Sequence, residues 1–416
     1  MLCVLLVITY LDRVCISVAG PRIQEDLHIG PLAWGWVTGV FSLAYAAFEI
    51  PSGAMGDRIG PRKVLTRIVL WWSGFTVLTG LVTGYYPLLF TRFLFGMGEA
   101  GAFPNASVAV ARWFPLHERG RAFGVWLMAS QLGGALTPLF VVPIQVHYGW
   151  RASFYVFGAV GVIWSGTWYW WFRDSPAEKK GVSQVELEET RGIVAKANHA
   201  LPWKTALRSG NIWVTMGLAF CYVYTFSFFQ SWFHTYLVKA RGYSEHDLLL
   251  SSLPFLVGGV ANFTGGLASR AMVRKAGLRW GRRSLGLAGL GGAALCAIAV
   301  MFAEQWLTAL ILLSLVYGGI CFQQPIMFAV CLDIGGEYAG AVVGAMNTAA
   351  QIGSFVSSLM FGYLVNRYGN YNLPFIPMAV LLLLGCYFWL KIDPAERLIP
   401  DLQLATEMAD VSVSNE

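Results

Sequence analysis

Residues 53–63 read GAMGDRIGPRK and connect two apolar stretches, near residues 33–55 and 64–83. Each stretch is about 20 residues long, which is the length at which an α-helix crosses about 30 Å of hydrocarbon. A short connector rich in glycine and basic residues between two such stretches is typical of a turn at a membrane surface. These residues therefore predict two consecutive membrane spans.

The rest of the chain is equally apolar. Of its 416 residues, 56% are hydrophobic and only 12% are charged, which is about half the charged fraction of a soluble domain. The apolar stretches lack the alternating pattern of barrel strands, so we predict an all-α membrane protein with twelve transmembrane helices. The predicted spans lie near residues 1–20, 33–55, 64–83, 86–112, 120–143, 151–172, 211–237, 248–272, 284–303, 307–332, 340–365 and 373–391.

One long hydrophilic stretch separates six spans from the other six. A second glycine-rich, basic connector, GGLASRAMVRKAGLRWGRR at residues 265–283, follows the eighth span and has Ser269 where the first connector has Asp57. Two related halves predict a duplicated fold in which a binding site forms between two bundles near the middle of the membrane. The predicted parts are an N-terminal six-helix bundle (1–172), a cytoplasmic central loop (173–210), a C-terminal six-helix bundle (211–391) and a cytoplasmic tail (392–416).

The positive charges sort by side of the membrane. The net charge of +6 could suggest nucleic acid as a partner, but 22 of the 29 Lys and Arg residues fall in connectors on one side of the predicted topology and only five on the other. This asymmetry predicts that both termini are cytoplasmic. We expect a multi-pass protein of the cell (inner) membrane that binds no nucleic acid.

Signs of other protein classes are missing from the sequence. The seven cysteines lie in or at the ends of spans, without CxxC pairs or pairing with histidines, so neither disulfides nor a metal site is indicated. We find no HExxH, nucleophile elbow or P-loop, so we expect no enzyme and no cofactor. Asp12 and Arg13 would interrupt the core of a signal peptide, so the first span is interpreted as a retained helix.

Five charged residues fall inside predicted spans: Asp12, Arg13, Glu49, Arg92 and Glu99. A charge at the bilayer centre costs from about 3 to above 10 kcal/mol unless it is paired or faces water. Asp12 and Arg13 are consecutive, so their side chains point about 100° apart on a helix. Arg92 and Glu99 are two turns apart and share a face. A buried carboxylate beside an arginine can take up and release a proton, and an arginine can bind a substrate carboxylate through two hydrogen bonds.

The connector at residues 53–63 resembles a known loop motif, G-x-x-x-D-R-x-G-x-[RK]-[RK], of the major facilitator superfamily, and it lies between spans 2 and 3 as in that family. The glycines allow a tight turn against neighbouring helix ends, and the aspartate can cap a helix or pair with a cation. The resemblance implies a conformational latch that is broken and remade between inward-open and outward-open states. The latch residues are Gly53, Asp57, Arg58, Gly60, Arg62 and Lys63.

Within the superfamily, YLDR (10–13), RFLFGMGEAGAFPN (92–105) and RWFPLHERGRA (112–122) resemble the anion:cation symporter family. The resemblance implies that Arg13 binds the substrate carboxylate. It also implies that Asp12 and Glu99 form a proton-coupling pair, with Arg92 as a partner of one of them. Tyr45 and Gln131 match family positions that hydrogen-bond a sugar acid.

The second half offers neutral candidates in its spans. Hydroxyl-rich substrates suit amides, which both donate and accept hydrogen bonds, and aromatic faces. We favour Gln324 and Asn347 as substrate contacts, expect His234 at the membrane interface, and leave open whether Glu49 titrates or only forms an ion pair at the cytoplasmic end. The other polar or aromatic candidates are Tyr222, Tyr224, Gln230, Trp232, Gln323 and Gln351.

These observations together predict a secondary active transporter. We expect proton-coupled symport of a small organic anion, most plausibly a sugar acid such as a hexonate, hexuronate or aldarate, by alternating access. The proton gradient drives transport without a cofactor, and one chain in the lipid bilayer is expected to suffice. The alternative is an antiporter or exchanger of another organic anion or a drug, which the residues alone do not exclude.

Overall fold

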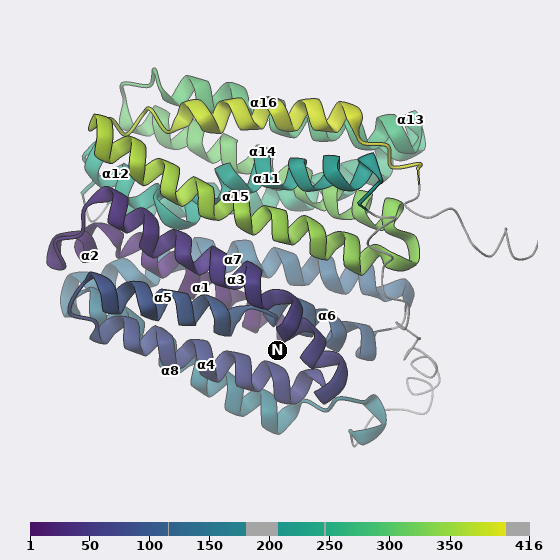
Figure 1. Ribbon diagram of the computed structural model, residues 1–416, viewed down its shortest axis with the longest axis horizontal. Coiled ribbons are helices and arrows are strands. Elements are labelled where there is room, and N and C mark those ends of the chain that lie inside the picture. Colours follow the sequence, from purple (N-terminus) through teal and green to yellow (C-terminus); the bar gives the residue numbers. More distant parts are fainter. Residues whose placement is uncertain (115, 180–206, 245–246, 397–416) are drawn as a thin grey trace, which may run out of the picture.

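The computed structural model describes residues 1–114, 116–179, 207–244 and 247–396. Within its helices, the side chains at positions 50, 54, 57, 111, 116–123, 337 and 339 lie outside this description. All regular secondary structure in the described part of the chain is helical, and the long helices run side by side in one bundle (Figure 1). The prediction of an all-α protein is confirmed.

The helices before the predicted central loop coincide with the first six predicted spans. They are α1 (Leu2–Val18), α2 (Gly20–Asp26), α3 (Pro31–Ile59), α4 (Pro61–Leu81), α5 (Tyr85–Glu99), α6 (Ala102–Trp113), α7 (Leu116–Tyr148) and α8 (Trp150–Trp171), followed by the short helix η1 (Pro176–Glu178). Residues 180–206 of the predicted loop and 397–416 of the predicted tail lie outside the described residues.

The helices after the loop coincide with the other six predicted spans. They are α11 (Gly210–Ser231), α12 (Phe233–Arg241), η2 (Asp247–Ser252), α13 (Leu253–Val300), α14 (Trp306–Gly335), η3 (Gly336–Tyr338), α15 (Ala339–Tyr368) and α16 (Phe375–Lys391). Helix α13 contains two predicted spans. Its backbone leaves the helical conformation between them, at Gly277, where φ is 75° and ψ is 171°.

By length and hydropathy alone, seven of the described helices can cross a membrane, or eight if α1 and α2 form one span. The difference from twelve has identifiable reasons. The two spans of α13 are joined in one helix, α5 and α6 are too short separately, and α16 has only 17 residues. Helix α8 is long enough, but its many Trp, Tyr, Gly and Ser residues lower its hydropathy. In Figure 1 the helices of the first half, purple to blue, lie mainly below those of the second half, teal to yellow.

Three spans are interrupted rather than straight. Helices α1 and α2 meet at an angle of 49°, α11 passes into α12 at Trp232, and α5 passes into α6 through Ala100 and Gly101. Gly101 has a φ of 91°, and a side chain there would overlap Ser52 of α3. Only glycine adopts this conformation readily. The break leaves the end of α5 free to present its last residue to the protein interior.

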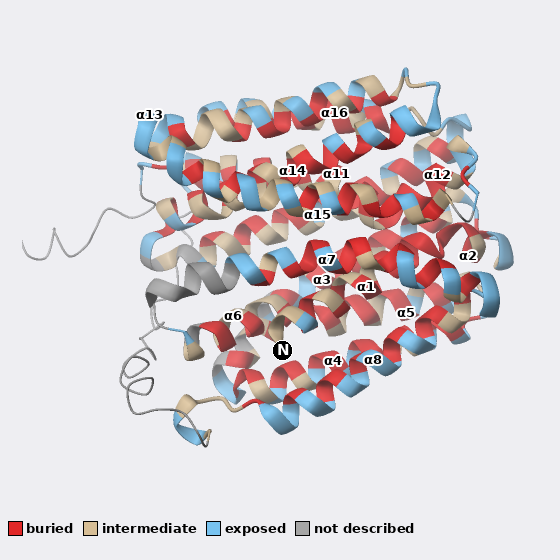
Figure 2. Ribbon diagram, turned by 180° about the vertical axis from the view of Figure 1, so that it is seen from behind, coloured by how far each residue is buried: buried red, intermediate tan, exposed pale blue. Residues whose placement is uncertain are grey.

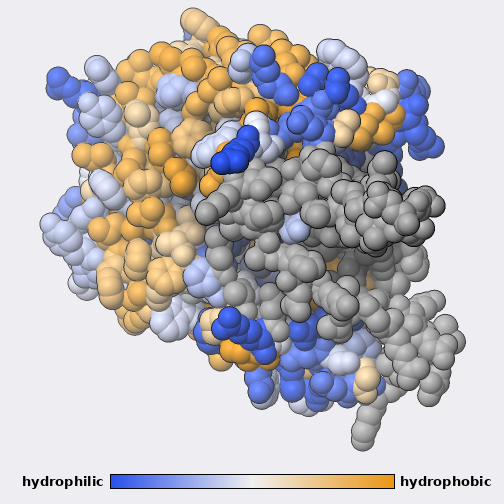
Figure 3. Space-filling view, turned by 45° about the vertical axis from the view of Figure 1, so that its right-hand side comes forward, coloured by the Kyte–Doolittle hydropathy of each residue, from blue (hydrophilic) through white to orange (hydrophobic). Residues whose placement is uncertain are grey.

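Side chains on the outside of the bundle are suited to lipid. Figure 3 shows hydrophobic side chains in a broad band, with hydrophilic residues toward both ends of the molecule. Large apolar residues such as Leu81, Ile163 and Leu295 are more than half exposed. A protein in water rarely exposes a continuous apolar surface of this extent. In a bilayer such a surface is stable, because it contacts lipid instead of water.

The two halves of the chain meet mainly along α3 with α15 and along α7 with η2 and α13, and α1 and α2 add contacts with α11 and α12. Figure 2 shows buried residues concentrated between these helices. The α3–α15 seam is closest near the end of the molecule where α2 and α12 lie, which we call the α2–α12 end; the opposite end, where α6 ends, is the α6 end. At the seam, a side chain on Gly35 would start 2.7 Å from the backbone oxygen of Ser358.

Replacing Gly35 with alanine is expected to open this seam. The added methyl group meets backbone atoms that cannot rotate away, so overpacking should cost about 1–3 kcal/mol in this closed arrangement. A cysteine introduced at Thr235, which is fully buried at this end, should react several-fold faster with a membrane-impermeant maleimide. Gly30→Ala is the matched control, because nothing lies within 4 Å of the position of its methyl group. Equal reactivity in the two variants would contradict this expectation.

Candidate functional site

An ion pair between the first and fourth spans lies at the centre of the molecule. The Nε of Arg13, on α1, donates to Oε1 of Glu99, the last residue of α5, at 2.5 Å. The Glu99 side chain is 1% exposed and that of Arg13 is 20% exposed. The second carboxylate oxygen of Glu99 is buried without a hydrogen-bond partner. Arg13 is therefore the more accessible member of the pair.

Aromatic rings surround the two buried arginines. The guanidinium carbon of Arg13 lies 5.0 Å from the centre of the Tyr45 ring and 5.2 Å from that of Phe41. The guanidinium of Arg92 lies 5.1 Å from the same Phe41 ring and 4.7 Å from Phe95. Aromatic faces stabilise a cation without neutralising it. The rings thus stabilise both guanidinium groups without taking the place of an anion.

Asp12 and Arg92 lie near one another without a direct bond. Asp12 is 3% exposed, and neither of its carboxylate oxygens has a hydrogen-bond partner. Arg92 is also 3% exposed, and it interacts electrostatically with both Asp12 and Glu99. The structure therefore brings together all four residues that the sequence assigns to charge recognition and proton coupling. Asp12 and Arg13 face different surroundings, as their helical spacing predicts.

A cavity of about 130 Å³ lies beside the ion pair, between the two halves. Tyr10, Arg13, Tyr45 and Glu99 line it from the first half. From the second half it is lined by the polar residues Tyr222, Gln324, Asn347 and Gln351. Of the five residues that the sequence assigns to substrate, this cavity contacts Arg13, Tyr45, Gln324 and Asn347. A second cavity of about 80 Å³ lies on the other side of Arg13, toward the α2–α12 end.

Gln131 is the predicted substrate residue that lies elsewhere. It is buried, and its side-chain oxygen accepts a hydrogen bond from the Tyr317 hydroxyl at 3.0 Å. This bond connects α7 to α14, across the two halves, and Gln131 does not line either cavity. Of the two adjacent glutamines in α14, Gln324 faces the larger cavity, whereas Gln323 is fully buried without a hydrogen-bond partner.

Glu49 contacts the second half of the chain. Its carboxylate accepts a hydrogen bond from the Asn347 amide at 2.9 Å, so the partner is an amide rather than the cation that an ion pair would require. Nearby, the rings of Phe103 and Phe328 stack with their centres 6.5 Å apart. These contacts, one hydrogen bond and one ring pair, lie between the halves on the α6 side of the larger cavity.

The α2–α12 end is joined more extensively. Ser17 hydrogen-bonds one ring nitrogen of His234 at 3.0 Å, and the other ring nitrogen bonds Ser251 at 2.9 Å. The Gln24 amide donates to the Thr235 hydroxyl at 3.0 Å. The expected interfacial position of His234 is wrong: the residue is 0% exposed and joins α1 to the second half. In this structure the cavities are closed toward the α2–α12 end.

Some residues around the cavities were not predicted. Tyr10 is one helical turn before Arg13, so the i, i+3 spacing on α1 could have identified it. Ser42, Ser227 and Ser354 come from three different helices and form a chain of hydrogen bonds. A serine in a membrane helix carries no distinguishing signal in one sequence, so these three could be found only from the folded chain.

The glycines of the predicted latch have two separate roles. Gly53 and Gly56 lie inside α3, where side chains would contact Pro104 and overlap Asn105 of α6. They allow close helix packing rather than a turn. Gly60 makes the turn to α4 with a φ of 94°, and a side chain on it would meet the carboxylate of Asp174.

Asp174 holds the start of α4 in place. Its carboxylate accepts a hydrogen bond from the Arg62 backbone N–H at 2.8 Å and lies 3.9 Å from the Arg112 guanidinium. The Arg62 side chain reaches back to the Tyr169 ring and backbone oxygen. The predicted latch residues Arg58 and Lys63 are exposed, and the side chain of Asp57 lies outside the described residues. The described contacts of this motif are made within the first half.

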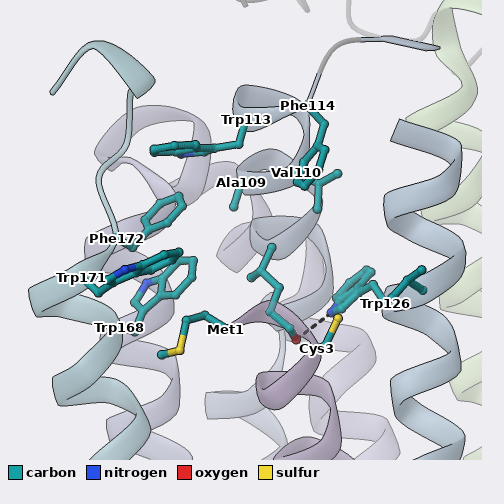
Figure 4. A pocket seen from close by; sticks show the side chains of 12 residues that line it. Met1, Cys3, Ala109, Val110, Trp113, Phe114, Trp126, Trp168, Trp171 and Phe172 are labelled. Atoms are coloured by element: carbon teal, nitrogen blue, oxygen red, sulfur yellow. Dashed lines mark hydrogen bonds between the residues drawn. The ribbon is translucent and has the colours of Figure 1, made fainter. Parts of the chain in front are cut away.

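A larger cavity of about 510 Å³ lies at the α6 end within the first half. Figure 4 shows Trp113, Trp168 and Phe172 on one side of it and Trp126 on the other, with the Trp126 indole donating to the Leu2 backbone oxygen. None of the described residues that line it has a charged side chain. A charged solute needs ionic or hydrogen-bonding partners, so the smaller polar cavities beside Arg13 form the candidate transport site.

A helical bundle with an apolar belt and a buried, charged cavity between two halves defines a multi-pass membrane transport protein, which is not an enzyme. The family model of the Major Facilitator Superfamily matches residues 2–358 and, in a second match, residues 279–403. The chain belongs to the Major Facilitator Superfamily.

Similar proteins span nearly the whole chain. The chain is 37% identical to the probable sulfoacetate transporter SauU of Cupriavidus necator over 94% of its own length and 92% of that protein. It is 30% identical to the D-galactonate transporter of Escherichia coli, covering 89% of each. It is 29% identical to the hexuronate transporter of Bacillus subtilis over 89% of its own length and 88% of that protein.

Solved structures agree on the fold. A bacterial homologue of the human lysosomal transporter Spinster, in an inward-facing and unoccupied conformation, superposes with a TM-score of 0.75, at 18% sequence identity. The match covers 94% of this chain and 95% of that one. Twelve transmembrane helices in two six-helix bundles are therefore the fold of this protein.

Replacing Asp174 with alanine is expected to destabilise the α3–α4 turn. The Arg62 N–H loses its acceptor, which for a helix start typically costs about 1 kcal/mol. The midpoint of thermal unfolding, followed by tryptophan fluorescence, should fall by a few degrees. Asp174→Asn keeps an acceptor oxygen and should lose less, and Glu178→Ala, an exposed acidic position in the same segment, should change little. A loss as large in Glu178→Ala would show that the capping bond is not the cause.

Proposed function

We propose that this protein is a proton-coupled symporter that carries a small organic anion by alternating access. The observation that carries the proposal is the buried Arg13–Glu99 ion pair, which lies at the cavity between the two halves. A cation that binds an anion and a carboxylate that binds a proton are the two parts that coupled transport requires. The ion pair places them in direct contact.

The substrate class is supported by the site and by the relatives. Arg13 offers a planar fork for a carboxylate or a similar acid group, and the amides of Gln324, Asn347 and Gln351 can bond to hydroxyl or acid oxygens. The named relatives carry, by their descriptions, sulfoacetate, hexuronate and galactonate. We therefore propose a sugar acid, such as a hexonate, hexuronate or aldarate, or a small sulfonated acid.

Coupling follows from competition for Arg13. With Glu99 ionised, its carboxylate occupies the guanidinium that a substrate acid would use. A proton on Glu99 removes the charge that holds Arg13 and so frees the fork for the incoming anion. Asp12 is the second proton acceptor in this scheme, and Arg92 stabilises whichever carboxylate is ionised. Proton and anion thus bind together, because each makes binding of the other more favourable.

Alternating access is supported by the unequal contacts at the two ends. The α2–α12 end is joined by hydrogen bonds around His234 and Thr235. On the α6 side of the larger cavity, the residues that the structure describes contribute the Glu49–Asn347 bond and one ring pair. We propose that the α6 end is cytoplasmic, as are both termini. The two predicted bundles, 1–172 and 211–391, would then rock about the site to open either end in turn.

Reconstitution tests the proposal. The purified protein is placed in liposomes, and uptake of radiolabelled sulfoacetate, galactonate and a hexuronate is measured with and without an imposed pH gradient. A symporter accumulates its substrate when the outside is acidic. An antiporter would instead expel its substrate under the same gradient, and an exchanger would need an anion inside the vesicle. No dependence on pH for any transported anion would refute proton coupling.

Replacing Glu99 with glutamine should uncouple transport. The neutral side chain mimics the protonated carboxylate, so Arg13 stays free for the anion. Accumulation driven by the pH gradient should fall at least tenfold, while exchange of labelled for unlabelled substrate across the membrane continues. Glu25→Gln is the control, because Glu25 is an exposed carboxylate that pairs with Lys239 at the protein surface and such pairs contribute little. Full gradient-driven accumulation by Glu99→Gln would remove Glu99 from the coupling mechanism.

Replacing Arg13 with lysine should nearly abolish substrate binding. Lysine keeps the charge but replaces the planar fork with a single ammonium group. Losing one partner of a buried charge pair costs about 2–5 kcal/mol, which corresponds to a loss of affinity of about 30-fold or more. Isothermal titration of the purified protein measures this loss. Arg22→Lys, at the α2–α12 end, is the matched substitution outside the cavities, and an equal loss there would argue against a specific role for Arg13.

A further inference from the structure

The smaller cavity, on the α2–α12 side of Arg13, has the composition of a binding site for an acid group. It has a volume of about 80 Å³ and brings together two cations and several neutral hydrogen-bonding groups from both halves. Its polar lining residues are Arg13, Thr38, Ser42, Arg92, Ser227, Gln230, Ser231, Gln351 and Ser354. No carboxylate lines it, whereas Glu99 lines the larger cavity.

Arg92 is the buried cation of this cavity. It is 3% exposed, its Nε has no hydrogen-bond partner, and among the described residues it makes no ion pair. Asp12 interacts with it electrostatically but does not line the cavity. Burying a guanidinium without a direct partner is costly. Arg92 therefore has hydrogen-bonding capacity left for an anion in the cavity.

Neutral donors surround the same space. The Ser354 hydroxyl hydrogen-bonds Ser42 at 2.7 Å and Ser227 at 2.8 Å, so three helices contribute to one chain of hydroxyls. Both the nitrogen and the oxygen of the Gln230 side-chain amide are buried without a hydrogen-bond partner. Buried polar groups are rarely left unsatisfied in a native protein. A ligand that accepts several hydrogen bonds would satisfy the Gln230 nitrogen and Arg92 together.

The two cavities lie on opposite sides of the Arg13 side chain and share part of their lining. Arg13 and Gln351 line both of them. The guanidinium carbons of Arg13 and Arg92 lie 5.2 and 5.1 Å from the centre of the same Phe41 ring. The distance between the two carbons therefore cannot exceed the sum of these two distances. A ligand bound to both arginines must therefore be short.

We propose that the substrate is a short dianion whose two acid groups bind the two arginines separately. Its carboxylate binds Arg13 from the larger cavity. Its second acid group, for which a sulfonate with three acceptor oxygens fits best, enters the smaller cavity and accepts hydrogen bonds from Arg92, the serine hydroxyls and the Gln230 amide.

Charge balance supports this assignment, and this part rests on the proposed proton coupling. With all four groups ionised, Asp12 and Glu99 cancel Arg13 and Arg92. Two protons on the carboxylates leave two uncompensated positive charges in a low-dielectric site, and a dianion neutralises both. The charge of Glu49 is left out of this balance, because Glu49 accepts a hydrogen bond from Asn347 and lines neither cavity. A dianion carried with two protons moves no net charge across the membrane.

Equilibrium binding to the purified full chain in detergent tests the proposal without any gradient. Two pairs of probes are compared by isothermal titration: sulfoacetate with 3-hydroxypropionate, and galactarate with galactonate, each pair differing in the second acid group. The wild-type protein should bind at least one dianion at least tenfold more tightly than its partner. Binding of monoanions as tight as that of dianions in both pairs would overturn the proposal.

Variants assign the preference to the smaller cavity. Arg92→Gln should weaken dianion binding at least tenfold more than it weakens binding of the paired monoanion. Ser354→Ala, a milder change, should reduce the dianion preference several-fold, and it keeps the test decisive if Arg92→Gln does not fold. Ser314→Ala is the control, because its hydroxyl bonds only within α14. Equal weakening of both members of a pair by Arg92→Gln and by Ser354→Ala would overturn the proposed subsite.

A second readout separates this proposal from the proposed function. In liposomes, uptake of the preferred dianion should be unaffected by an imposed membrane potential. Uptake that responds to the potential would overturn the pairing of one dianion with two protons. If no uptake responds to a pH gradient, proton coupling fails, but the binding preference and its loss in Arg92→Gln still decide the subsite on their own.

Discussion

The constraint on which the structure depends is the cost of holding charge inside a low-dielectric bundle. Arg13 and Glu99 can be buried only because they are bonded to each other and surrounded by aromatic rings. That requirement fixes the neighbouring backbone. Helix α5 ends at Glu99, the chain turns through Gly101, and α3 approaches closely enough that Gly101 has no room for a side chain. The break in the helix and the position of the carboxylate are one feature.

The two halves of the molecule contribute unequally to the site. Among the described residues, the charged side chains that line the cavities come from α1 and α5, while α11, α14 and α15 provide hydroxyl, amide and aromatic groups. Charge recognition in one half and neutral contacts in the other mean that the ligand itself connects the halves. Apart from the exposed ion pair of Glu25 with Lys239, the contacts described here between the halves, around His234 at one end and Asn347 at the other, are hydrogen bonds between neutral groups or with one carboxylate. Such bonds can exchange without separating opposite charges in a medium of low dielectric constant.

Much of this arrangement could be predicted from the sequence, because the bilayer imposes strong rules. Span length, the sorting of basic residues and the cost of buried charge identified the helices and the four central ions from one chain. Features that depend on tertiary packing could not be predicted. Gln131 bonds to a tyrosine 186 residues away, His234 is buried by serines from α1 and η2, and the serines of the smaller cavity meet only when three helices pack together. Short-range patterns carry no information about those partners.

The seam between α3 and α15 has a consequence for the tightness of the closed end. At Gly35 the main-chain atoms of the two helices are in close contact. A Cβ atom added at Gly362 would lie 2.6 Å from the Pro31 backbone oxygen. Main-chain contacts of this kind leave no space that a changing rotamer could open to a water molecule. Because protons cross proteins along chains of water, a seam without room for water also resists proton leakage. The glycines therefore limit the passage of water and protons through the closed end.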